Sequence, residues 1–209
     1  MQPNPGPGRF IAVEGLDGAG TTTQTRLLAQ ALARSTPVHV THEPSDGPIG
    51  LQIRLALEHR IQVDAATLAA LFAADRMDHL FHRTGQGGIA CHLERGAAVI
   101  TDRYYLSSFA YQGLSLDWEW IWTLHAQCLQ PDVTIFIDVP VEVCLARIAA
   151  GRGARVELFE TKETLVRARA SYLRAIERLR KAGEAIKIVD GDAPPEEVQG
   201  KVWERAISF

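Results

Sequence analysis

The sequence predicts an α/β fold, a doubly wound parallel sheet of five strands flanked by helices. Five short runs are apolar throughout rather than alternating, which is typical of strands that are buried on both faces. Segments with helical spacing separate these runs from end to end, so each strand can return to the sheet through a helix. In such a sheet, ligands bind beyond the carboxyl ends of the strands.

The apolar runs are short and end at turn residues, which sets the expected strand bounds. We expect strands at 9–14, 38–41, 97–102, 133–138 and 185–189. Three of the loops that follow these strands, at 15–22, 43–46 and 102–104, carry Gly, acidic and Arg residues. Because carboxyl ends of parallel strands share one edge of a sheet, these loops should meet in space.

Helical periodicity is clearest after the first strand, where apolar residues recur at Leu27, Leu28, Ala31 and Leu32. The predicted helices span 21–34, 49–59, 64–83, 85–95, 118–129, 141–149, 160–182 and 195–207. No repeat, low-complexity block or linker interrupts the pattern, so we expect one domain over residues 9–209. Residues 1–8 are rich in Pro and Gly, and we expect them to form a disordered tail.

Composition narrows the class of protein. The 209 residues are 46% hydrophobic and 22% charged, a globular balance, and the net charge of -3 argues against a protein that coats nucleic acid. No apolar stretch approaches the ~18 residues of a membrane span. Cys91, Cys128 and Cys144 are odd in number and widely spaced, which fits buried thiols in a reducing cytoplasm better than disulfides or zinc.

The first loop has the skeleton of a phosphate-binding loop: G-x-x-x-x-G, one residue, then Thr. Its glycines let backbone N–H groups turn toward a phosphate, and the helix that follows adds its positive N-terminal end. Thr22 stands where a hydroxyl normally ligates Mg²⁺. The candidate phosphate-binding residues are Gly15, Gly18, Ala19, Gly20, Thr21, Thr22 and Thr23.

The usual lysine of this loop is absent, because Thr21 occupies its position. Lysine neutralises charge on the β- and γ-phosphate oxygens, and threonine cannot. Another cation must therefore replace it, and Arg103 and the segment 147–162 hold candidates. Losing one such stabilising group typically lowers a rate by ~10²–10³.

Six short motifs follow one another in a fixed order, at 14–20, 43–44, 71–76, 102–104, 107–113 and 131–132. On these motifs the sequence resembles the thymidylate kinase family over nearly its whole length. The resemblance implies a P-loop kinase fold and ATP-dependent phosphorylation of dTMP to dTDP with Mg²⁺. It also implies a cytoplasmic homodimer that acts on small molecules, with no nucleic-acid or membrane partner.

The resemblance also assigns an acceptor site. Phe72 and Arg76 lie four residues apart on a predicted helix and so share a face, which suits a ring stacked on a base and a guanidinium that reaches its carbonyl. Arg103 would bind the dTMP phosphate bidentately, and Tyr111 would pack under the deoxyribose. The candidate dTMP-binding residues are Glu43, Phe72, Arg76, Arg103, Ser108, Tyr111 and Gln112.

The remaining roles that the resemblance implies lie near the reacting phosphates. Asp102 would hold Mg²⁺ through water together with Thr22, and Asp17 would join the hydrogen-bond network of the acceptor phosphate. The segment 147–162 resembles a lid whose Arg152 and Arg155 could reach the ATP phosphates on closure. With Asp17 and Arg103, these two lid arginines form the predicted catalytic set.

Two alternatives stay open at this point. Because the loop lacks its lysine, the chain could be a nucleotide-binding protein with little turnover. It could also be a related kinase with another acceptor, such as a nucleoside or dUMP. Tyr111 and the Phe72/Arg76 pair argue against a ribonucleotide acceptor.

Overall fold

All five apolar runs form strands of one parallel sheet in the computed structural model, which describes residues 1–152, 158–159 and 161–208. The strands are β1 (Phe10–Gly15), β2 (Val38–His42), β3 (Ala98–Asp102), β4 (Val133–Asp138) and β5 (Ile186–Asp190). Their order is β2-β3-β1-β4-β5, and every neighbouring pair is parallel. β1 therefore lies at the centre of the sheet, and the loop after it reaches the middle of the carboxyl edge.

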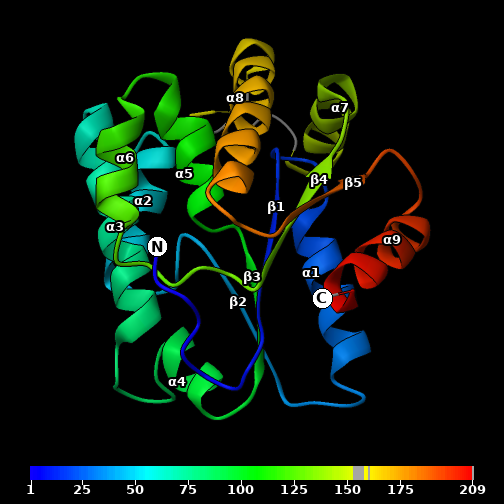
Figure 1. Ribbon diagram of the computed structural model, residues 1–209. Coiled ribbons are helices and arrows are strands. Elements are labelled where there is room, and N and C mark those ends of the chain that lie inside the picture. Colours follow the sequence, from blue (N-terminus) through cyan, green and yellow to red (C-terminus); the bar gives the residue numbers. More distant parts are fainter. Residues whose placement is uncertain (153–157, 160, 209) are drawn as a thin grey trace.

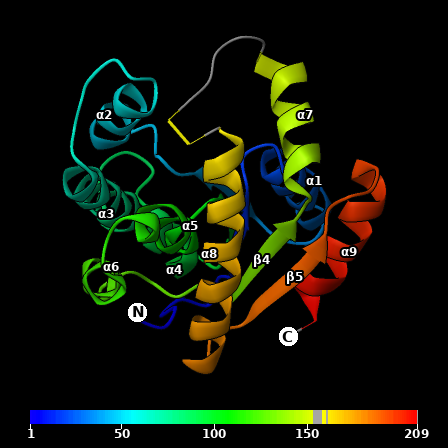
Figure 2. The ribbon, with the colours of Figure 1, turned by 90° about the horizontal axis from the view of Figure 1, so that it is seen from above.

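Helices cover both faces of this sheet (Figures 1 and 2). On one face lie α1 (Thr21–Leu32) and α9 (Pro195–Ile207). On the other lie α4 (Ile89–Glu94), α5 (Tyr105–Tyr111) and α8 (Lys162–Lys181). Further out are α2 (Pro48–Leu57), α3 (Ala65–Phe81), the 3₁₀ turn η1 (Gln112–Leu114) and α6 (Trp118–His125), while α7 (Val141–Arg152) follows β4. The predicted fold class is confirmed.

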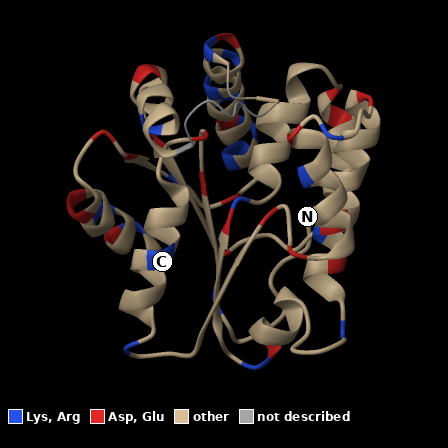
Figure 3. Ribbon diagram, turned by 180° about the vertical axis from the view of Figure 1, so that it is seen from behind, with Lys and Arg blue, Asp and Glu red and all other residues tan. Residues whose placement is uncertain are grey.

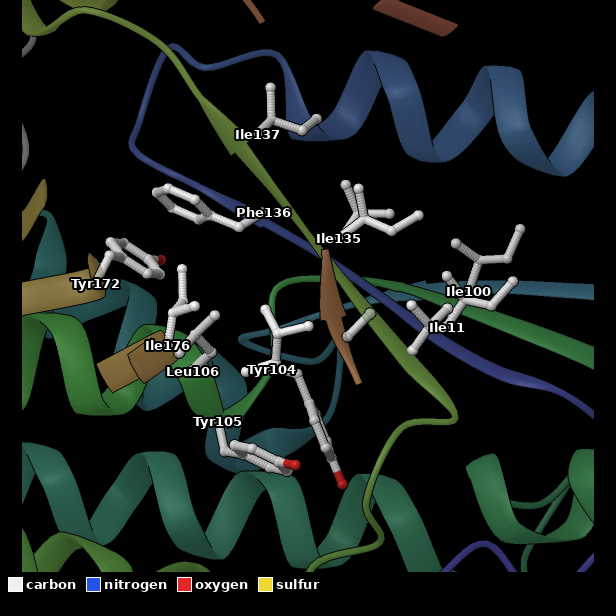
Figure 4. Close-up of a cluster of buried hydrophobic side chains, with 14 of the residues drawn as sticks. Ile11, Ile100, Tyr104, Tyr105, Leu106, Ile135, Phe136, Ile137, Tyr172 and Ile176 are labelled. Carbon is white, nitrogen blue, oxygen red and sulfur yellow. The ribbon is translucent and has the colours of Figure 1, made fainter. Parts of the chain in front are cut away.

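The core lies between the sheet and its helices. Figure 4 shows Phe136 of β4 on the same side of the sheet as Tyr104, Tyr105 and Tyr172, and its ring contacts that of Tyr172. Ile135 and Ile137 of the same strand lie on the opposite side, toward α1. Charged residues lie mainly on helices and loops, while the strands are largely uncharged (Figure 3). Glu14 departs from this rule, because it is fully buried in the middle strand. None of the helices in the described residues is long and apolar enough to cross a membrane.

The sequence pattern does not predict α5. This seven-residue helix is buried on nearly every side, so it shows no polar face from which a helical period could be read. The predicted segment 85–95 begins later, at Ile89, because Gly87 (φ 83°) and the extended Gly88 precede it. The segment 118–129 ends earlier, at His125, where the chain turns toward β4.

Residues 1–8 differ from the disordered tail that their composition suggests. Gln2 forms a bridge with the segment before β4, since its N–H donates to Cys128 O (2.8 Å) and its C=O accepts from Gln130 N (2.6 Å). The Asn4 side chain donates to Asp132 Oδ2 at 3.0 Å and to Gly8 O at 2.7 Å. These bonds offset the entropy of ordering the segment, and its prolines reduce that entropy.

Candidate active site

A cavity of about 940 Å³ lies beyond the carboxyl ends of β1, β2 and β3. The three loops that the sequence analysis brings together all line it. Its walls include the first loop and α1, the segment 40–44, α3, the start of α5 and the end of α7. Most of the predicted site residues lie on these walls: Asp17, Gly18, Gly20, Thr21, Thr22, Thr23, Glu43, Phe72, Arg76, Asp102, Arg103, Ser108, Tyr111 and Gln112.

The first loop joins β1 to α1 through a curled backbone. Gly18 and Gly20 have φ values of 80° and 93°, which L side chains rarely adopt. A Cβ on Gly18 would also lie 2.5 Å from the Cys144 carbonyl oxygen in α7. The N-terminus of α1 has no side-chain cap, so its first N–H groups are available to an anion.

Thr22 and Asp102 lie together beside this loop. The Thr22 hydroxyl donates to Asp102 Oδ2 at 2.5 Å, while Asp102 Oδ1 is buried with no hydrogen-bond partner in the described part of the chain. A hydroxyl and an unpartnered carboxylate oxygen are hard ligands of the kind that Mg²⁺ prefers. These two residues would hold a magnesium ion, Asp102 through water.

Arg103 lies between the loop and α5. It forms an ion pair with Asp17 (2.7 Å) and donates to Gly15 O and to the Tyr172 hydroxyl (3.0 Å). Tyr111 donates to the other Asp17 oxygen at 3.1 Å. Asp17 therefore holds both Arg103 and Tyr111 in place. Burial of Tyr111, and then the negative charge of Asp17, keep the pKa of the Tyr111 hydroxyl well above its usual range.

Arg76 is the second arginine of the site and is buried, with a side chain only 1% exposed. Its Nε and NH2 groups contact Glu43 Oε2 at 2.8 and 2.6 Å, and NH1 donates to Ser108 Oγ at 3.1 Å. NH1 also lies 3.1 and 3.3 Å from the two ring nitrogens of His125. Burial, and then the Arg76 charge, lower the pKa of His125 well below its ordinary value, so the ring is neutral and can accept this bond.

These contacts use most of the Arg76 donors. A guanidinium has five N–H groups. Glu43, Ser108 and His125 take four of these groups and leave one NH2 hydrogen for a ligand in the cavity. Glu43, a candidate dTMP-binding residue in the sequence analysis, lines the cavity but contacts Arg76 and, at 3.4 Å, His79.

Two further predicted acceptor residues line the same cavity as Arg76. Phe72 is half-buried and packs against Ile53 and Leu68 while it also lines the cavity. Gln112 is buried in η1 and lines the same cavity. The pocket thus combines aromatic side chains with a few fixed polar groups, as small-molecule sites usually do.

The predicted lid falls partly outside the described residues. Arg155 lies outside them, and the side chain of Arg152 is likewise not described. Arg147, five residues before Arg152 in α7, donates to Ala19 O at 3.4 Å and to Gly191 O at 3.3 Å. It is therefore a described cation that contacts the phosphate loop itself.

Several residues of this site are not anticipated by the sequence analysis. Glu14 accepts hydrogen bonds at the start of α5, Tyr172 joins it to Arg103, and His79 and His125 bracket the Arg76–Glu43 pair. Glu14 carries a readable signal, since a carboxylate inside an otherwise apolar strand must have buried partners. Tyr172, His79 and His125 lie on helices, and nothing in the sequence pattern of these helices indicates that the three side chains reach the site.

A central strand that runs into a glycine-rich loop and a helix N-terminus, with a Thr–Asp pair beside it, defines a P-loop nucleotide-binding protein. The chain matches the sequence model of a family described as thymidylate kinase over residues 13–202. It is 40% identical over 202 residues to a thymidylate kinase of Thermomicrobium roseum, which covers 93% of this chain and 92% of the relative. It is 37% identical over 215 residues to a thymidylate kinase of Nitrosomonas eutropha, covering 97% and 94%. The chain belongs to the thymidylate kinase family.

Proposed function

We propose that the protein transfers the γ-phosphoryl group of ATP to dTMP, giving dTDP and ADP. The observation that carries the proposal is the continuity of one cavity from the phosphate loop to the Phe72/Arg76 wall. Such a cavity can hold a donor triphosphate and an acceptor nucleotide end to end. The alternative of a protein that binds nucleotides without turnover rests on Thr21 alone.

In this proposal the loop N–H groups and the N-terminus of α1 bind the ATP phosphates. Thr22 and Asp102 would hold Mg²⁺, which when bound neutralises charge on the transferred phosphoryl group. Because Thr21 cannot neutralise phosphate charge, we assign that role to the arginines of the lid, Arg152 and Arg155.

The acceptor occupies the other part of the cavity. Phe72 stacks on thymine, the remaining Arg76 N–H donates to its carbonyl, and Tyr111 packs under the deoxyribose. Ser108 and Gln112 complete the polar surroundings of the base, and Arg103 binds the dTMP phosphate. This phosphate is already an anionic nucleophile, so alignment and charge neutralisation carry the reaction without a general base.

A coupled assay of ADP formation with dTMP, dUMP and UMP tests this proposal. We expect turnover with dTMP, less with dUMP and least with UMP, whose 2′-hydroxyl would meet Tyr111. The matched control is Asp102→Ala, which should lose ~10² or more in rate because it removes a carboxylate that would hold Mg²⁺. Nucleotide binding without dTMP-dependent ADP formation would favour the alternative function.

We also propose a cytoplasmic homodimer in which α3 and α6 form the contact. Phe81 and Trp120 leave 40% and 38% of their surface exposed on these two helices. Light scattering should give twice the 23.0 kDa chain mass, and a monomer mass would exclude this assembly.

A further inference from the structure

Arg103 has an unusual backbone. Its φ of 74° places it, a non-glycine residue, in the left-handed region. An L side chain there costs roughly 1–2 kcal/mol, so the surrounding structure must hold it. The conformation turns the chain sharply from β3 into α5 and directs the guanidinium back toward the phosphate loop, where it reaches Asp17 and Gly15 O.

Glu14 holds both ends of this turn. Its Oε1 accepts from Tyr104 N (2.9 Å), the amide directly after Arg103, and from Ser107 N (3.1 Å). These are two of the N–H groups that the start of a helix leaves free, and α5 has no side-chain cap of its own. A carboxylate from the central strand therefore caps α5 and fixes the backbone that follows Arg103.

The same carboxylate is linked to the Arg103 side chain. Glu14 Oε2 accepts from Ser107 Oγ (2.5 Å) and from the Tyr172 hydroxyl (3.2 Å). Arg103 NH1 in turn donates to the Tyr172 hydroxyl at 3.0 Å. The Tyr172 hydroxyl also lies 2.7 Å from Ser107 Oγ. Because Tyr172 is fully buried in α8, its hydroxyl depends on Glu14, Ser107 and Arg103 for its hydrogen bonds.

We propose that Glu14 is a positioning residue of the reaction, which acts through the α5 turn and Tyr172 to hold Arg103 for the phosphate of dTMP. The inference rests on the proposed function and adds a residue to it. Glu14 is fully buried beneath the site and does not line the cavity, so it acts only through these partners.

Burial raises the pKa of Glu14 to about 7, although the Arg103 charge and the bonds from Ser107 and Tyr104 lower it. Glu184 provides a matched control. It is also a buried carboxylate whose pKa burial raises to about 7, and it accepts from a buried tyrosine, Tyr105 (2.8 Å). Glu184 does not line the cavity.

The test compares steady-state kinetics of Glu14→Gln and Glu184→Gln. Glutamine keeps one oxygen for the two α5 amides, but its NH₂ cannot accept from Ser107 Oγ or Tyr172. We expect Glu14→Gln to lower kcat/KM for dTMP by about tenfold or more, with the KM for ATP changed less than twofold. Glu14→Leu, which also loses the amide contacts, should fall further. Glu184→Gln should leave both KM values unchanged.

Tyr172→Phe and Tyr105→Phe repeat the comparison without altering a charge. If Glu14→Gln does not fold, this second pair of variants tests the positioning role of Glu14. We expect the KM for dTMP to rise only in Tyr172→Phe. If the wild type is active but the two variants of each pair have the same kcat and KM for dTMP, the positioning role of Glu14 is overturned. The proposed function would then still stand. A wild-type chain that neither binds dTMP in a calorimetric titration nor phosphorylates it would overturn the proposed function and this inference with it.

Discussion

At the scale of single residues, the site depends on side chains whose positions are fixed by charged partners. Arg76 and Arg103 each contact a carboxylate, Glu43 and Asp17 respectively, at 2.8 Å or less. Removing one partner of a buried ion pair strongly destabilises the fold, so these pairs also stabilise the surrounding structure. The cavity therefore presents cations that are already oriented and lose little side-chain entropy on binding.

His125 gives a residue-scale prediction. His125→Leu removes an acceptor from Arg76 NH1, whereas His125→Asn keeps one. We expect the leucine variant to raise the KM for dTMP by about three- to tenfold, the effect of one hydrogen bond, and the asparagine variant to recover most of it. The KM for ATP serves as the internal control. If the two variants had the same KM for dTMP, His125 would be a packing residue only.

At the scale of elements, the sequence predicts those with a clear pattern and misses those without one. Each apolar run becomes a strand, and the 3.6-residue period locates the long helices α1, α3 and α8. The α5 helix is buried by its surroundings, so its formation depends on tertiary packing and on the Glu14 cap rather than on local preference.

The site follows the same division. Loop residues such as Gly20, Thr22 and Asp102 can be predicted because strand ends bring them together. Partners such as Tyr172 and His125 cannot, since they reach the site from distant helices whose packing no short motif encodes. Glu14 is the exception, because a charged residue within an apolar strand must have buried hydrogen-bond partners, and this can be predicted from the sequence alone.

The lid gives a prediction at the scale of an element. If its arginines replace the missing lysine, Arg152→Ala combined with Arg155→Ala should lower kcat by ~10² or more, as loss of an arginine finger does. Arg174→Ala, on α8 outside the cavity lining, is the control for loss of an arginine charge. Single-turnover kinetics at saturating ATP and dTMP would measure the chemical step. Unchanged turnover in the double variant would leave Arg147, at the phosphate loop, as the candidate.

At the scale of the whole molecule, burial of carboxyl groups makes stability depend on pH. Burial raises the pKa of Glu184 from 4.5 to about 7. Between these values the folded state binds more protons than the unfolded state, so the contribution of Glu184 is fully present below pH 4.5 and is lost as pH rises through 7. His39, whose pKa burial lowers to about 4, acts in the opposite sense and loses its contribution as pH falls from 6.5 through 4.

Urea unfolding of the wild type and Glu184→Gln between pH 4.5 and 8 isolates this contribution. The free energy of unfolding of the wild type, relative to the variant, should decrease across this range by at most about 3 kcal/mol. The His39 contribution cancels in the difference, because both proteins carry that residue. A constant difference across the range would show that Glu184 has an ordinary pKa in the folded state.

The most direct test of the account is whether a phosphate loop without lysine supports transfer to dTMP. Phosphorus NMR of the purified protein with ATP, Mg²⁺ and dTMP identifies the products themselves. We predict that dTDP and ADP appear in equal amounts and that no inorganic phosphate accompanies them. Release of inorganic phosphate without dTDP, or no reaction at all, would contradict the central claim.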